Sequence, residues 1–276
     1  MLCRIKEQLH ALFTSTDEAT KLLKLHGFSS SNYYNVPKLA LLEKGIEFEE
    51  VLSYTGVGPK YKPEYLDKSP LGKVPALETE EGFISESRAI VEYIERAFPT
   101  PSLLPDSAFG IAKVQELAQF IELYFELVAR RLIPNLLGGT EPDPKVLQEF
   151  ATNINKAVPA LAKLSDFNTF AYGDQFTLAD IAAILNLPVV RSVGKKFLGK
   201  DPLSDVPGLD DYCERMEARP HVQTIRADAA ADQAGFMAHL KACLLYTSPS
   251  PRDEQFHLVC RLLLEKWGGG GGGGGG

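Results

Sequence analysis

The chain contains little cysteine or histidine, and neither residue type is spaced for a shared site. Its four cysteines are scattered along 276 residues and form no C-x-x-C pair. Scattered cysteines without a disulfide framework are typical of a reducing compartment, so we predict a cytoplasmic protein. The five histidines show no paired ligand spacing either, which argues against a metal site. We therefore predict that the protein uses no metal.

Long hydrophobic runs and clusters of basic residues are also missing. No stretch of the sequence approaches the roughly 20 consecutive apolar residues that a membrane-spanning helix needs. The net charge of −7, without any concentrated Lys/Arg run, argues against a nucleic-acid-binding surface. We accordingly expect neither a membrane nor a nucleic acid as a partner. The length of 276 residues is sufficient for about two domains.

The two ends of the sequence differ in character from the rest. Residues 1–20 place apolar side chains at helical spacing but lack the apolar run of a signal peptide, so we interpret them as an extension. Residues 244–253 resemble translated sequencing-adapter sequence, and residues 268–276 are a glycine homopolymer. We therefore predict that residues 243–276 are an artefactual, disordered tail.

Between these ends, the residue pattern predicts a small α/β region followed by a helical region. Strands are predicted over 21–27 and 46–52, with a helix through 38–44 between them, and a hairpin and a helix follow residue 71. Prolines then mark a linker. Beyond it we predict a long helix over 107–133 and no strand. The expected boundaries of the extension, α/β domain, linker, helical domain and tail are 1–20, 21–100, 101–105, 106–242 and 243–276.

The segment from residue 71 to residue 87 carries the clearest chemistry. Val74 precedes a proline that biases it to extended geometry, so its backbone N–H and C=O can pair with a ligand. Glu86 and Ser87 stand in the first turn of the following helix, where free N–H groups and the helix dipole favour an anion. These groups can hold an amino-acid-like or peptide-like ligand by its ammonium and its carboxylate. The alternative is an X-Pro turn followed by a capped helix without a ligand.

Five features occur together in this order. They are a strand ending at Gly27, a serine-rich turn into a helix, Gly72-Lys73-Val74-Pro75 before a hairpin, Glu86-Ser87 opening a helix, and a Thr-x-x-Asp capping box in an all-helical second half. Over about residues 21–240 the sequence thereby resembles the cytosolic glutathione S-transferase family, in its serine-type, bacterial-like form. The resemblance implies an α/β + all-α fold: a thioredoxin-like N-terminal domain, with the Val74–Pro75 bond in cis, followed by an α-helical C-terminal domain.

The resemblance also implies glutathione as the co-substrate and a homodimer as the assembly. The backbone of Val74, held by Pro75, would pair with the cysteinyl unit of glutathione. Glu86 and Ser87 would hold the γ-glutamyl ammonium and carboxylate. Lys73 would reach the glycyl end.

The implied chemistry requires a thiolate, because the neutral thiol is a poor nucleophile with a pKa of about 8.5. A hydroxyl that donates a hydrogen bond to the sulfur, near a helix N-terminus, favours the charged form. In serine-type relatives this donor lies in the turn after the first strand, and alignment on Lys38-Leu39-Ala40-Leu41 selects Ser31. Pro37, inside the expected start of the helix, puts this choice in question. Three other donors therefore stay open: Asn32, Tyr33 and Tyr34.

The predicted function is conjugation of glutathione to a small hydrophobic electrophile, with detoxification as its role. No cysteine lies in the serine-rich turn, which disfavours thiol–disulfide exchange by a protein thiol. Two other functions stay open: a non-catalytic scaffold or interaction protein of the same fold, and a glutathione-dependent isomerase resembling maleylacetoacetate isomerase. We expect the electrophile pocket between the serine-rich turn and the first long helix, at Phe28, Tyr33, Phe109, Ile111 and Tyr124.

Overall fold

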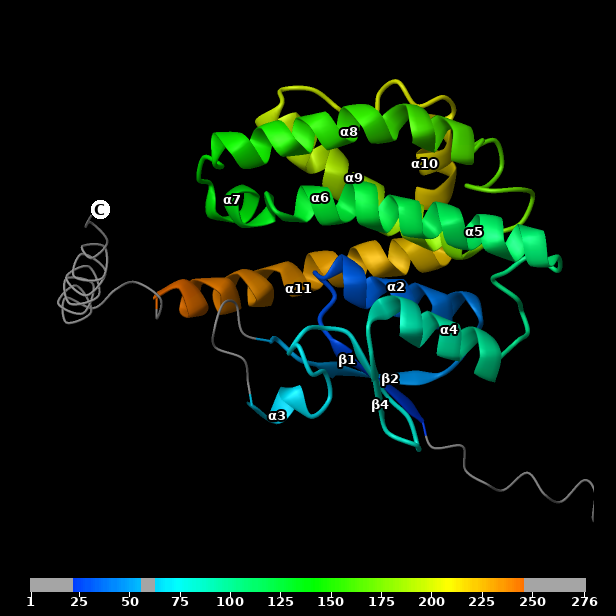
Figure 1. Ribbon diagram of the computed structural model, residues 1–276. Helices are drawn as coiled ribbons and strands as arrows, with labels where there is room; N and C mark the ends of the chain where they lie inside the picture. The colour runs from blue at the N-terminus through cyan, green and yellow to red at the C-terminus, as the bar shows by residue number, and fades with distance from the viewer. Residues whose placement is uncertain (1–21, 56–62, 246–276) are drawn as a thin grey trace, which may run out of the picture.

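The computed structural model describes residues 22–55 and 63–245. These residues form a four-stranded sheet with helices above it and a larger group of helices stacked beyond them (Figure 1). The predicted extension and most of the predicted tail lie outside the described residues, although the last helix continues to Leu245. Within these two ranges, no helix combines the length and the apolar character needed to cross a membrane.

The sheet is mixed and has the strand order β2-β1-β3-β4. Strands β1 (Leu23–Gly27) and β2 (Phe48–Leu52) run parallel and are connected through helix α2 (Asn32–Glu43). Strand β3 (Ala76–Glu78) runs antiparallel both to β1 and to β4 (Phe83–Ser85). This arrangement confirms the thioredoxin-like N-terminal region that the sequence predicts.

Helices α2 and α4 (Ser87–Ala97) cover one face of the sheet, and the short helix α3 (Pro63–Leu66) lies on its other side (Figure 1). Strand β1 ends at Gly27, where the ring of Tyr34 leaves no room for a side chain: a Cβ at Gly27 would stand 2.2 Å from Cδ2 of Tyr34. Apolar side chains from the sheet and both helices form the smaller of two cores: Leu23, Leu25, Tyr34, Leu41, Leu77, Ile90 and Ile94.

After β4, the regular elements of the described residues are all helices, as predicted. Helix α9 (Leu178–Phe197) lies in the larger core and begins with the expected capping box, in which Asp180 accepts the N–H of Thr177 at 2.8 Å. Around it are α5 (Ala108–Ile121), α6 (Leu127–Arg130), α7 (Ile133–Gly138), α8 (Pro144–Leu164), α10 (Leu209–Glu217) and α11 (Pro220–Leu245). Figure 1 shows α11 running alongside α2, so the helical half contacts the sheet-bearing half directly.

The predicted continuous helix over 107–133 is wrong in one respect, because a π-turn interrupts it. This turn, η1 (Glu122–Glu126), separates α5 from α6, and α7 starts after a further break. The α-helical period predicts Val128 as an inward residue. The extra residue in the π-turn instead brings Glu126 and Ala129 fully into the interior and leaves Val128 half-buried.

Candidate functional site

Ser31 ends the turn after β1 and is the N-cap of α2. Its Oγ accepts a hydrogen bond from the N–H of Tyr34 at 3.4 Å, and its carbonyl accepts the N–H of Asn35 at 3.1 Å. Within residues 22–55 and 63–245, the hydroxyl proton of Ser31 has no acceptor. A half-buried hydroxyl with an unused proton at a helix N-terminus is suited to donate to an anion.

Pro37 lies inside α2, because the helix begins at Asn32. A proline has no N–H, so the carbonyl of Tyr33, four residues earlier, has no helical donor. The hydroxyl of Ser87 donates to that carbonyl at 3.0 Å. This bond joins the first turn of α4 to the serine-rich turn and places Ser87 beside the segment that contains Ser31.

Two of the alternative donors, Asn32 and Tyr33, are already hydrogen-bonded to one carboxylate. The Tyr33 hydroxyl donates to Oε2 of Glu126 at 2.5 Å. The Asn32 amide donates to Oε1 of Glu126 at 3.2 Å and to Oδ1 of Asn186 at 2.7 Å. Burial and the adjacent Glu126 carboxylate raise the pKa of the Tyr33 phenol well above its usual value. The two amide protons of Asn32 are donated to Glu126 and Asn186, and the hydroxyl proton of Tyr33 is donated to Glu126. Neither side chain therefore has a free donor in this arrangement.

The third alternative, Tyr34, faces the sheet. It is buried, and its hydroxyl donates to Oε2 of Glu50 at 2.7 Å. Lys38 Nζ lies 2.6 Å from the same carboxylate oxygen and 2.7 Å from Oδ2 of Asp228 in α11. Burial and the Glu50 carboxylate raise the pKa of the Tyr34 phenol strongly. Its hydroxyl therefore belongs to a contact between α2, β2 and α11.

Helix α11 also holds the serine-rich turn. Oδ2 of Asp232 accepts the backbone N–H of Ser30 at 2.8 Å, and Oδ1 accepts the hydroxyl of Tyr54. The ring of Phe28 stacks on Phe236 with a centroid distance of 5.1 Å. The residue before Ser31 is thus fixed from the helical half of the protein.

The other predicted binding residues lie around the β3–β4 hairpin. The Val74–Pro75 bond is cis, as the sequence predicts. Strand pairing starts at Ala76, so Val74 stands outside the ladder. Lys73 is exposed. The backbone of Val74 is therefore not used in the strand pairing, and its pairing with a ligand stays a prediction.

Glu86 precedes α4 in an unusual backbone conformation, with φ 71° and ψ 120°. Such a positive φ at a non-glycine residue costs on the order of 1–3 kcal/mol and is concentrated at functional sites. The Glu86 side chain is exposed and makes no capping hydrogen bond to α4. The first N–H groups of α4 are therefore without a side-chain cap, beside the buried Ser87.

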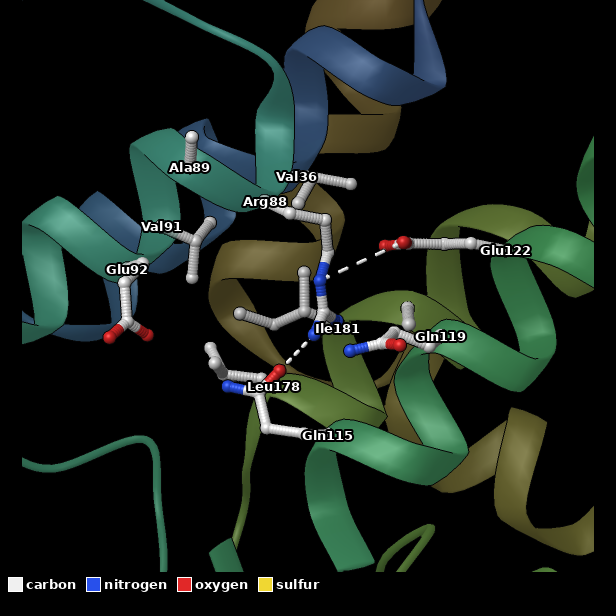
Figure 2. A pocket seen from close by; sticks show the side chains of 11 residues that line it. Val36, Arg88, Ala89, Val91, Glu92, Gln115, Gln119, Glu122, Leu178 and Ile181 are labelled. Carbon is white, nitrogen blue, oxygen red and sulfur yellow. Dashed lines mark hydrogen bonds and ion pairs between the residues drawn. The ribbon is translucent and has the colours of Figure 1, made fainter. Parts of the chain in front are cut away.

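A cavity of about 310 Å³ lies next to this helix end, between α4, α5 and α9 (Figure 2). Arg88 extends across it from α4, donates to Gln115, and places its Nε 3.8 Å from the Glu122 carboxylate. Burial raises the pKa of Glu122 to about 7, although the Arg88 charge opposes this shift. The residues that line this cavity include none of those predicted for the electrophile pocket.

The residues predicted for the electrophile pocket are not brought together. Phe109, at the start of α5, is 74% exposed, and Tyr124, in η1, is 53% exposed. The helical rise places these two residues roughly 20 Å apart. Ile111 is half-buried near Phe109, whereas Phe28 packs against α11. Of the five, only Phe28 and Tyr33 adjoin Ser31 in the serine-rich turn.

Four residues of the helical half that are hydrogen-bonded to that turn or to the first two residues of α2 were not identified from the sequence: Glu126, Arg130, Asn186 and Asp232. The spacing of Glu126 and Arg130 is that of an i,i+4 ion pair, which the sequence shows. The π-turn that faces the pair inward, and the packing of α11, have no local sequence signal. Among the described residues there is no group of three or more His, Cys, Asp or Glu able to hold a metal ion.

Comparisons with known proteins agree along most of the chain. Family models for the glutathione S-transferase N-terminal and C-terminal domains match residues 25–102 and 116–220. A glutathione S-transferase from Pseudomonas putida is 41% identical over 221 residues, which are 80% of this chain and 99% of that protein. Elongation factor 1-gamma 3 from Oryza sativa subsp. japonica is 34% identical over 170 residues, 60% of this chain but only 39% of that protein. A solved maleyl pyruvate isomerase, described as a bacterial zeta-class glutathione S-transferase, is 27% identical, covers 75% of this chain and 97% of its own, and has a TM-score of 0.59.

Proposed function

The chain belongs to the glutathione S-transferase family, and from this premise we propose that it binds glutathione, ionises the thiol and directs the thiolate at a small hydrophobic electrophile. The backbone of Val74 pairs with the cysteinyl unit. Glu86 takes the γ-glutamyl ammonium, and the N-terminus of α4 at Ser87 takes the γ-glutamyl carboxylate. Lys73, which is exposed, is placed at the glycyl end.

Ser31 is the proposed catalytic residue. Its hydroxyl donates a hydrogen bond to the glutathione sulfur, which lowers the pKa of the thiol and releases the proton to solvent. The thiolate then forms a C–S bond with the electrophilic carbon, and the leaving group departs with its bonding electrons. The observation that carries this proposal is the unused hydroxyl proton of Ser31, in a turn whose Asn32 and Tyr33 side chains are committed to Glu126.

The thiol pKa tests this assignment directly. Ser31→Ala should raise the pKa of bound glutathione by one to two units, equivalent to about 1.4–2.7 kcal/mol, seen as a shift of the thiolate absorbance titration to higher pH. Ser31→Thr keeps the hydroxyl and should restore the low pKa. Ser30→Ala, in the same turn, is the matched control and should leave the titration unchanged. An unchanged titration in Ser31→Ala would move the role to Asn32, Tyr33 or Tyr34.

A non-catalytic scaffold is the second candidate. The hydroxyl of Ser87 is already committed to the Tyr33 carbonyl, which removes one donor from the proposed γ-glutamyl site. Similarity to an elongation factor 1-gamma also supports this candidate. Calorimetric titration separates the two, because the scaffold predicts no glutathione binding at millimolar ligand and the enzyme predicts saturation.

A glutathione-dependent isomerase is a variant of the enzymatic proposal. The serine-rich turn and the similarity to a maleyl pyruvate isomerase support it. Comparing turnover of a maleyl compound with turnover of an aryl halide discriminates between isomerisation and conjugation.

We also propose that the protein is a homodimer. Leu123, Tyr124 and Leu127 form an apolar strip on η1 and α6, and their exposed fractions of 50%, 53% and 49% are high for such side chains. A second copy of the chain would cover this strip. A cytoplasmic location and a detoxification role stay predictions.

A further inference from the structure

We propose that Glu126 is a positioning residue for the serine-rich turn, and that it fixes the direction of the Ser31 hydroxyl by holding the two residues that follow it. This inference rests on the proposed function. Glu126 accepts hydrogen bonds from the side chains of Asn32 and Tyr33, acts on Ser31 through these two residues, and takes no part in the covalent step.

The first argument is the burial and hydrogen bonding of the carboxylate. Glu126 has no exposed surface. Oε2 accepts the Tyr33 hydroxyl at 2.5 Å, and Oε1 accepts the Asn32 amide at 3.2 Å and Nε of Arg130 at 2.7 Å. A buried carboxylate is a poor contribution to stability compared with an apolar side chain, so its presence here calls for a role beyond filling the core.

The second argument is the π-turn that places Glu126. An uninterrupted α-helix would carry this position away from the interior, and the π-turn is the device that turns it toward α2. Such single-turn π insertions are frequent at functional sites. The insertion therefore has a local consequence, which is the contact between Glu126 and the first two residues of α2.

The third argument is that the contact is part of a closed network. The guanidinium of Arg130 donates to Oδ1 of Asn32 at 2.6 Å and lies over the Tyr33 ring at 4.5 Å. The other side of Asn32 is fixed by Asn186 of α9 at 2.7 Å. Asn32 therefore has fixed partners from η1, α6 and α9, and Ser31, its neighbour, is held at a defined position relative to the helical half.

The test is Glu126→Gln, with Glu149→Gln as the matched control. Glu149 is an exposed glutamate on α8 paired with Arg131, away from the serine-rich turn. In Glu126→Gln, one accepting carboxylate oxygen is replaced by an NH2 group, which donates. The side chain can then no longer accept the hydrogen bonds of Asn32, Tyr33 and Arg130 together. We expect the kcat with an aryl halide at pH 7 to fall about tenfold or more while the Kd for glutathione changes less than threefold, and the rate to recover toward higher pH as the thiol ionises unaided. Glu149→Gln should match the wild type.

A purely structural role gives a different result. It predicts a lower Tm in Glu126→Gln but an unchanged kcat and pH profile per folded molecule, and this result overturns the proposal. If Glu126→Gln does not fold, Tyr33→Phe removes a single donor to Glu126, and the same shift of the pH profile is expected in smaller size; an unchanged profile in this variant also overturns the proposal.

Amide hydrogen exchange keeps the inference separate from the proposed function. Residues 30–35 should exchange faster in Glu126→Gln than in the wild type without any ligand, and equal exchange overturns the proposal. Failure of the wild type to bind glutathione would instead reject the proposed function and leave the exchange result as the measure of positioning.

Discussion

The Ser87 hydroxyl donates to the Tyr33 carbonyl at 3.0 Å, and so occupies an acceptor that α2 itself cannot reach. The helical donor to that carbonyl would be the N–H of residue 37, which is a proline. In the free protein, the Ser87 side chain, which we propose binds glutathione, therefore donates to a carbonyl of α2 that has no helical donor. This bond joins the proposed binding site to the serine-rich turn.

Pro37→Ala should uncouple them. Alanine supplies an N–H to Tyr33, so the protein should be more stable by about 1–3 kcal/mol because an interior proline is removed from a helix. The released Ser87 hydroxyl can then donate to the ligand carboxylate, and the Kd for glutathione should fall roughly threefold to tenfold. Thermal unfolding and calorimetry measure the two effects. A stabilised variant with an unchanged Kd would show that the Ser87 hydroxyl does not contact the ligand.

Glu86→Gln should weaken glutathione binding about tenfold without changing the Tm. The substitution removes the charge that attracts the γ-glutamyl ammonium, while the side chain is exposed and makes no capping bond that stability depends on. Calorimetric titration measures the Kd. Glu92→Gln, on the same helix, is the control, because that carboxylate pairs with Arg96 at the surface. Equal affinity in wild type and Glu86→Gln would place the γ-glutamyl group elsewhere.

Much of the N-terminal region is predictable because its signals are local. Glycine ends β1, proline precedes β3, and alternating apolar residues mark the strands, so element order follows from neighbouring residues. The capping box at Thr177 and Asp180 is equally local and is present as predicted. The start of α2 has no such local signal: Pro37 leaves the Tyr33 carbonyl without a helical donor, and Ser87, fifty residues after Pro37, supplies the hydrogen bond instead.

The rest of the candidate site depends on contacts between distant segments. From the sequence alone, Glu126 would be taken for an exposed helix residue, but in the structure the π-turn directs it into the interior. From the sequence alone, Asp232 would be taken for a surface residue, but in the structure α11 packs so that Asp232 accepts the backbone N–H of Ser30. The predicted pocket residue Phe109 is exposed on α5, and a helix face of this kind cannot be assigned to core, pocket or surface before its packing is known.

The apolar strip on η1 and α6 predicts the assembly state. Leu127→Lys should place a charge in the proposed interface and shift the protein from twice the chain mass to the single-chain mass in sedimentation at micromolar concentration. Leu52→Lys is the control, because Leu52 is exposed to 66% at the end of β2. A wild type that sediments as a single chain would reject the dimer, and a dimer unaffected by Leu127→Lys would move the interface to another surface.

Glu122 predicts a pH dependence of stability with a defined sign. Burial raises its pKa to about 7 in the folded protein from an ordinary value of 4.5. Between these two pH values the folded protein holds a proton that the unfolded chain has released, so the contribution of Glu122 to stability is complete below pH 4.5 and is lost as the pH rises through 7. The loss amounts to at most about 3 kcal/mol.

Denaturant unfolding of the wild type and of Glu122→Gln should therefore give free energies of unfolding that diverge between pH 4.5 and 7, with the value for the wild type falling relative to that for the variant. Glu116→Gln, an exposed neighbour on α5 paired with Lys113, should follow the wild type. Parallel curves for the wild type and Glu122→Gln would mean that Arg88 keeps Glu122 ionised throughout, and that the cavity beside α4 holds a permanent ion pair.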